Sequence, residues 1–163
     1  MKLYGIGILI LSLVHAVPAY AGFWSQCSIY AAPVTMEKIA YVESGGNPYA
    51  IDDDTSRRSY SFGSGEKAVQ TARVLVDEGH NVDLGLVQIN IANIRKYGIG
   101  ISEAFNPCYN VFIGSYILYQ GYGLALRRFG SIPVALYRAL EYYNSGHFYG
   151  DSEYANKVWE ALN

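Results

Sequence analysis

Charged, sulfur-bearing and imidazole side chains are scarce in this chain of 163 residues. The formal net charge is only −2 at pH 7, so there is no excess of Lys and Arg of the kind that nucleic acid requires, and we expect no nucleic-acid partner. The three histidines, His15, His80 and His147, are scattered, and there are only two cysteines. Residues so few and so far apart do not form a metal-ligand pattern, so we expect no metal and no cofactor. Neither a G-x-S-x-G elbow nor a phosphate-binding glycine loop is present, which leaves carboxylate chemistry as the main candidate.

Hydrophobic runs long enough for a comfortable membrane span are also lacking. An apolar stretch over residues 3–14 follows Lys2 and is itself followed by Ala19-Tyr20-Ala21. A basic start, an apolar centre and an A-x-A pattern are typical of a signal peptide, so we predict a leader over residues 1–21 that is cleaved after Ala21. An uncleaved anchor is the alternative, but the run is short for a spanning helix. We therefore expect an exported domain over residues 22–163.

The two cysteines, Cys27 and Cys108, predict a disulfide. Their even number and the expected export to an oxidising compartment agree with such a bridge, which would tie the N-terminal segment to a distant helix. Two buried thiols are the alternative interpretation.

Tyrosine is the residue that the chain has in abundance, with sixteen copies. Its ring offers a flat apolar face and its hydroxyl a hydrogen-bonding group, a combination that suits sugars, although many tyrosines pack in protein cores.

Helical signals dominate the rest of the sequence. Thr35, just after Pro33, is the expected N-cap of a helix that ends near Glu43, where Gly45 permits a left-handed stop. Further helices are expected over residues 66–78 with Ser64 as cap, over 91–97 with Asn90 as cap, from Asn106-Pro107 onward, over 133–143 and over 152–162. Residues 52–65 predict a loop or short β-hairpin, and residues 83–90 an extended or turn segment. No linker divides the chain, so we predict one mainly α-helical domain.

Glu43 has an unusual position in the stretch YVESGGNPYAI. A carboxylate at the C-terminal end of a helix faces the negative end of the helix dipole, which disfavours its charged form. Neighbouring tyrosines and apolar residues would add desolvation in the same direction. Both effects favour a protonated side chain at neutral pH, as a general acid requires, while a solvated helix end is the alternative.

Four short motifs together resemble those of the soluble lytic transglycosylases. They are ESGGNP from Glu43, GLVQIN from Gly85, YYNSG from Tyr142 and YANKV from Tyr154. That family has a Glu-Ser pair near Asn-Pro, then G-L-M-Q, then A-Y-N-A-G and a late Tyr, in this order. The long spacer after the first motif, and the segments DLGLVQIN and FNPCYN, resemble the branch associated with type IV secretion and conjugation systems. The resemblance covers residues 23–160.

This resemblance implies a lysozyme-like fold and a periplasmic enzyme that cleaves the bond between N-acetylmuramic acid and N-acetylglucosamine in peptidoglycan. Glu43 would be the single catalytic acid. The acetamido group of the substrate would stabilise the cationic centre, and the C6 hydroxyl would close a 1,6-anhydro ring, so no second carboxylate is needed. Peptidoglycan strands are the implied substrate, and other components of a secretion or conjugation machine are the implied partners.

The same resemblance assigns a set of substrate-binding residues around Glu43. Ser44 would orient the acid, and the remaining positions would line the pocket; they are Gln88, Asn90, Tyr143, Asn144 and Tyr154. Asn90 and Val87 depart from the family, which often has Met at both places. The structural alternatives are a turn amide for Gln88, a helix-end cap for Asn144 and core packing for the two tyrosines.

Two other functions stay open from the sequence. In a hydrolytic muramidase, one of the aspartates Asp52, Asp53 and Asp54 would position a water molecule, and the product would be a reducing sugar. A non-catalytic glycan-binding component of an envelope machine is the second alternative. It would not need a carboxylate at an unfavourable helix end.

Overall fold

The computed structural model describes residues 19–162, so most of the predicted leader lies outside the described residues. Its elements are α1 (Ala19–Cys27), α2 (Pro33–Ser44), β1 (Ala50–Asp53), β2 (Arg58–Ser61), α3 (Gly65–Asp77), β3 (Val82–Leu84), β4 (Ile89–Asn90), α4 (Ile91–Lys96), α5 (Ile101–Ala104), α6 (Pro107–Phe129), α7 (Ile132–Ser145) and α8 (Ser152–Leu162). The expected mainly helical class is confirmed. Between residues 19 and 162, none of the helices has both the length and the apolar composition needed to cross a bilayer.

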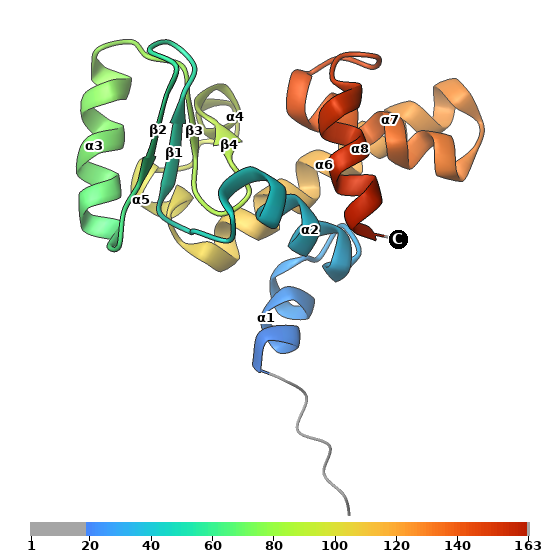
Figure 1. Cartoon of the computed structure of the whole chain (residues 1–163), viewed down its shortest axis with the longest axis horizontal. Coiled ribbons are helices and arrows are strands. Elements are labelled where there is room, and N and C mark those ends of the chain that lie inside the picture. Colours follow the sequence, from blue (N-terminus) through green and yellow to red (C-terminus); the bar gives the residue numbers. More distant parts are fainter. Residues whose placement is uncertain (1–18, 163) are drawn as a thin grey trace, which may run out of the picture.

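The β elements form one small antiparallel sheet with the strand order β2-β1-β3-β4. β1 and β2 are the hairpin that residues 52–65 predict, and the segment DLGLVQIN supplies β3, a tight turn and β4. Figure 1 shows the sheet beside α3 on one side of the molecule and α7 and α8 on the other, with α2 and α6 between them. The sheet and the C-terminal helices therefore stand on either side of the end of α2.

The long helix α6 is the centre of the core. Asn106 caps it by accepting a hydrogen bond from the Tyr109 N–H at 3.0 Å, and Pro107 occupies the first helical position, as the sequence predicts. A side chain at Gly114 would lie 2.5 Å from a Val87 methyl group and 3.0 Å from the Tyr143 hydroxyl. Glycine is therefore needed there so that α6, the β3–β4 turn and α7 can meet.

Two of the expected helix caps are wrong in detail. α2 already begins at Pro33, so Thr35 lies buried inside the helix, and the cap position is Ala32. Ser64 does occupy the cap position of α3, but its side chain makes no capping hydrogen bond. The short helix α5 has no counterpart among the predicted elements.

The predicted disulfide is confirmed. Cys27 at the end of α1 is bonded to Cys108 in the first turn of α6, and their Cα atoms are 4.9 Å apart. The bond closes a loop that contains α2, the whole sheet and α3 to α5. A cross-link over so long a loop restricts the unfolded chain strongly, which in the chain-entropy account stabilises the fold by about 4 kcal/mol.

Candidate active site

Glu43 lies in the last turn of α2, where the helix stops abruptly. Gly45 adopts φ 62° and Gly46 φ 82°, and their N–H groups donate to the carbonyls of Tyr41 and Ala40. Such left-handed residues close a helix at little cost only when they are glycine. The sequence ESGG therefore fixes the point at which the carboxyl group leaves the helix.

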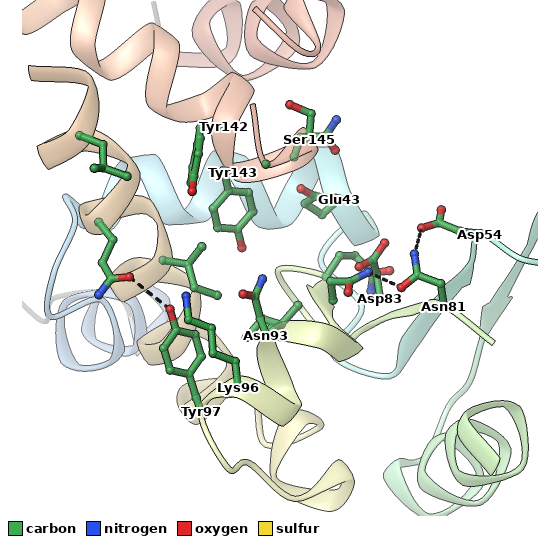
Figure 2. Close-up of a pocket in the computed structure, with 18 residues that line it drawn as sticks. Glu43, Asp54, Asn81, Asp83, Asn93, Lys96, Tyr97, Tyr142, Tyr143 and Ser145 are labelled. Atoms are coloured by element: carbon green, nitrogen blue, oxygen red, sulfur yellow. Dashed lines mark hydrogen bonds between the residues drawn. The ribbon is translucent and has the colours of Figure 1, made fainter. Parts of the chain in front are cut away.

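Glu43 opens into a cleft of about 450 Å³ between the sheet and the C-terminal helices. Asp83, Gln88 and Asn90 line its sheet side. Tyr142, Tyr143 and Asn144 line it from α7, and α4 and α6 close the remainder. Figure 2 shows Glu43 between the Tyr143 ring and Asp83 of β3, with Asn81 just before that strand. A cleft of this size and polarity suits a small part of a sugar polymer.

The protonation of Glu43 matches that of a general acid. Burial raises the pKa of its carboxyl group to about 8; a contact with Tyr154 lowers the pKa, and the negative charges of Asp83 and Asp52 raise it further. The direction is the one expected from the sequence. Its main cause is desolvation by the surrounding domain, which an isolated helix end would not provide. Glu43 therefore keeps its proton at neutral pH while it faces an open cleft.

The two tyrosines assigned to the site contact it differently. The Tyr143 hydroxyl lines the cleft and donates a 2.7 Å hydrogen bond to the Val87 carbonyl, which fixes the ring beside Glu43. Tyr154 is only 7% exposed and lies behind the acid, outside the cleft lining. Its hydroxyl is near enough to lower the pKa of Glu43, yet meets strict hydrogen-bond geometry with no group in residues 19–162. The Tyr154 hydroxyl is thus a polar neighbour of the Glu43 carboxyl group.

The side chains of Ser44 and Gln88 both donate to backbone carbonyls of the β3–β4 turn. The Ser44 hydroxyl contacts the Leu86 carbonyl at 2.7 Å and the Ala40 carbonyl at 3.1 Å, and it does not line the cleft. Gln88 does line the cleft, but its amide nitrogen donates to the Gly85 carbonyl at 2.6 Å and more weakly to that of Ala50 at 3.3 Å. Its backbone has φ 46°, which is uncommon for a residue with a side chain and often marks functional sites.

The two asparagines lie at opposite sides of the cleft. Asn90 caps α4 through the Ala92 N–H, as predicted, and donates to Asn81, which in turn donates to Asp54. Asn144 lines the cleft from the end of α7 and donates to Asp151 at 2.9 Å. The structure therefore brings Gln88, Asn90, Tyr143 and Asn144 together around Glu43 and leaves Ser44 and Tyr154 behind it.

The three consecutive aspartates of the hydrolytic alternative point in different directions. Asp53 is fully buried; burial alone would raise its pKa, but hydrogen bonds from Ser56 and His80 outweigh this and lower it to about 2. Asp52 bonds the Ser59 hydroxyl on the sheet, and Asp54 lines the outer end of the cleft. Asp53 is therefore a structural residue of the β1–β2 turn.

Asp83 also lines the cleft, although the family motifs assign it no role. Burial raises the pKa of its carboxyl to about 7; Asn90 lowers it, and the charges of Asp54 and Asp52 raise it. The alternation of β3, with Val82 and Leu84 buried and Asp83 half-exposed, carries a signal for this position. Lys96, Tyr97 and Asn93 also line the cleft without a motif that marks them. Within residues 19–162 no three acidic, Cys or His side chains are grouped so that they could hold a metal ion.

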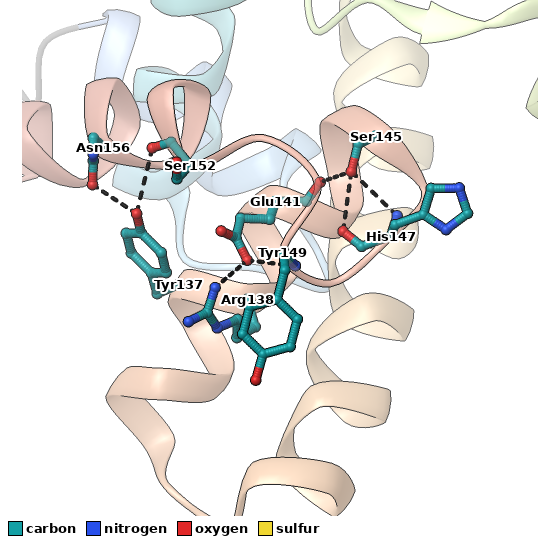
Figure 3. Close-up of polar contacts among 8 residues, drawn as sticks. All are labelled: Tyr137, Arg138, Glu141, Ser145, His147, Tyr149, Ser152 and Asn156. Carbon is teal, nitrogen blue, oxygen red and sulfur yellow. Dashed lines mark hydrogen bonds and ion pairs between the residues drawn. The ribbon is translucent and has the colours of Figure 1, made fainter.

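The rim of the cleft after α7 is held by a buried ion pair. Glu141 is 1% exposed, and its Oε2 accepts hydrogen bonds from Arg138 at 2.7 Å and from the Tyr149 N–H at 3.0 Å. Figure 3 shows Arg138 between this carboxylate and the Tyr149 ring, with Ser145 bridging the start of the loop. Ser145 and Gly146 line the cleft, so the carboxylate of Glu141 holds the loop that follows this edge.

We expect Glu141→Ala to lower the free energy of unfolding by about 2 kcal/mol, because Arg138 and the Tyr149 N–H both lose their buried acceptor. Chemical denaturation measures this loss. Glu141→Gln keeps an acceptor oxygen and serves as the matched control, with a smaller loss expected. Equal stability of the alanine variant and the wild-type protein would contradict a structural role for the pair.

A mainly helical domain with a protonated carboxyl group in an open polar cleft defines a general-acid site suited to glycosidic bonds. Residues 26–160 match the family model described as the Transglycosylase SLT domain, and the chain belongs to this family. It is 40% identical over 126 residues to the type IV secretion system protein virB1 of Brucella abortus, a match that covers 77% of this chain and 53% of that protein. It is 30% identical over 132 residues to protein virB1 of Agrobacterium fabrum, covering 79% and 52% respectively. The chain thus spans about half the length of these curated relatives, and no solved structure gives a significant match.

Proposed function

We propose that the protein is a lytic transglycosylase that cleaves the bond between N-acetylmuramic acid and N-acetylglucosamine in peptidoglycan. The observation that carries this proposal is the position of Glu43, whose pKa is raised by burial, in the cleft of a domain from the transglycosylase family. The cleft is lined mainly by polar and aromatic side chains, which suit an uncharged sugar chain.

In the proposed reaction Glu43 serves twice. Its proton passes to the glycosidic oxygen as the bond from that oxygen to C1 of the muramic acid breaks, and the substrate's acetamido group stabilises the positive charge at C1. The C6 hydroxyl then bonds to C1 and returns its proton to the Glu43 carboxylate. The atoms balance without water, and the product carries a 1,6-anhydro ring.

The remaining cleft residues have supporting roles in this proposal. Tyr143, fixed by the Val87 carbonyl, places its ring against the reacting sugar. Tyr154, with no other partner for its hydroxyl among the described residues, orients the Glu43 carboxyl from behind. Gln88, Asn90 and Asn144 contact the flanking sugars, and Ser44 holds the end of α2 against the β3–β4 turn.

Digestion of purified peptidoglycan tests the reaction type directly. We expect mass spectrometry to find anhydro-muropeptides as the main products, because the C6 hydroxyl is held by the substrate itself and needs no second protein base. A hydrolytic muramidase would give the corresponding products heavier by one water. If the hydrated products dominate, the transglycosylase mechanism is wrong, although Glu43 could still be the acid.

The setting proposed for this activity is the periplasm, where the enzyme opens the cell wall for a type IV secretion or conjugation apparatus. The names of the Brucella and Agrobacterium relatives support this setting. Export through the predicted leader and contact with other components of such an apparatus belong to the same proposal.

A further inference from the structure

The sheet places two carboxylates directly opposite each other beside the cleft. Asp52 of β1 is in register with Asp83 of β3, and Asp83 is in register with Asn90 of β4. Side chains opposite each other on antiparallel strands are neighbours, and like charges in this arrangement are destabilising. None of the ion pairs found in residues 19–162 includes Asp52 or Asp83. The fold therefore places two carboxyl groups side by side, and neither has an ion-pair partner among these residues.

Asp83 of this pair lines the same cleft as Glu43, and Asp52 lies next to it on the neighbouring strand. Figure 2 shows Asp83 on the sheet side and Glu43 at the end of α2. The other ionisable groups around Glu43 are Tyr142 and Tyr143 of α7, Tyr154 of α8, and Asp54, Lys96 and Tyr97, which line the same cleft. Lys96 lies over the Tyr97 ring at 5.1 Å and forms an ion pair with neither carboxyl group.

Asp83 and Glu43 both titrate near neutral pH. Burial is the main cause that raises their pKa values, to about 7 for Asp83 and about 8 for Glu43, and the charge of Asp83 raises the pKa of Glu43 further. Well below pH 7 both groups are protonated and the influence of Asp83 disappears.

We propose that Asp83, with Asp52 beside it on the neighbouring strand, is a positioning residue that acts through Glu43 and keeps its carboxyl group protonated. The carboxylate of Asp83 opposes ionisation of Glu43 across the cleft, so Glu43 stays protonated under neutral and mildly alkaline conditions. The inference rests on the proposed role of Glu43 as the general acid. It also explains why the sheet retains two adjacent aspartates that weaken it, since function commonly retains destabilising arrangements.

The test compares Asp83→Asn with wild type in kcat/KM on purified peptidoglycan from pH 6 to pH 9. At pH 6 we expect the two proteins to agree within about twofold, because Asp83 is uncharged in both cases. The alkaline limb of the variant should move to lower pH by roughly one unit, which makes it about fivefold less active at pH 8. Its stability at pH 8 should be at least that of wild type, because the cross-strand repulsion is gone.

Controls separate this effect from others. Asp77→Asn makes the same chemical change on the exposed face of α3 and should leave the pH profile unmoved. Asp52→Asn should move the limb in the same direction by less, and it provides the test if Asp83→Asn does not fold. An unmoved limb in both variants, or an equal loss of activity at every pH, would overturn the inference. Failure of the wild-type protein to form anhydro products would instead overturn the proposed function.

Discussion

Glu43→Gln is expected to abolish cell-wall cleavage while the protein still binds peptidoglycan. The substitution keeps the shape of the side chain but removes the proton that breaks the glycosidic bond, and general acid catalysis alone contributes about 10²–10⁴-fold. Because the same group also accepts the C6 proton in the second step, we expect a loss at or above the upper end of this range. Release of anhydro-muropeptides and co-sedimentation with insoluble peptidoglycan measure the two properties separately.

Glu37→Gln is the matched control, since it makes the same change on the same helix outside the cleft lining. It should retain full activity. If Glu43→Gln and wild type cleave peptidoglycan equally well, Glu43 is not the acid. If neither protein cleaves peptidoglycan but both bind it, the result favours a glycan-binding function.

The same substitution has a signature in stability. Glu43 is protonated in the folded protein up to about pH 8, whereas its ordinary pKa is 4.5. The folded state therefore binds the extra proton between these values, so the wild-type protein loses stability as pH rises from about 4.5 to about 8. Glutamine does not titrate, and the variant should lack this part of the pH dependence.

Asn110→Ala is expected to produce the largest loss of stability, about 3–5 kcal/mol, because one buried amide satisfies three backbone groups. Its Oδ1 accepts from the Val87 N–H at 2.8 Å, and its Nδ2 donates to the carbonyls of Leu84 at 2.9 Å and Ala104 at 2.8 Å. Alanine would remove the side-chain partner of all three groups at a position that is 1% exposed. Chemical denaturation measures the change.

Asn106→Ala on the same helix removes only the capping bond to Tyr109 and should cost about 1 kcal/mol. A loss for Asn110→Ala no greater than this would show that water or a rearranged turn replaces the amide. Because Asn110 holds the turn that carries Val87 and Gln88, we also expect the variant to be less active at temperatures where it remains folded.

The helices and the raised pKa of Glu43 could be predicted because their signals are local. Pro33, Asn106 and the glycines after Ser44 act within a turn of the chain, so propensity and capping rules find them. The disulfide followed from the cysteine count and the expected export. Where the local rule was incomplete, as for Thr35, the first helical proline simply began the helix earlier.

The rest of the site depends on contacts between distant segments. Asp83 lies near Glu43 only because β3 pairs with β1 and the sheet faces α2, and Asn110 is in the segment FNPCYN but bonds to residues before it. The three aspartates 52–54 look equivalent in the sequence, yet strand alternation buries Asp53 and leaves Asp52 opposite Asp83. The order of the motifs identified the residues that match the family pattern. It did not identify the aspartates that lie around them.

Three parts of the site meet at Gly114 of α6. At this one point the backbone of α6 lies against a Val87 methyl group, the Tyr143 hydroxyl and Met36 of α2. These contacts place three parts of the site against the same backbone atoms: α2, which carries Glu43, the β3–β4 turn, and α7, which carries Tyr143. A side chain at residue 114 would therefore disturb all three parts of the site at once, without touching Glu43 or substrate directly.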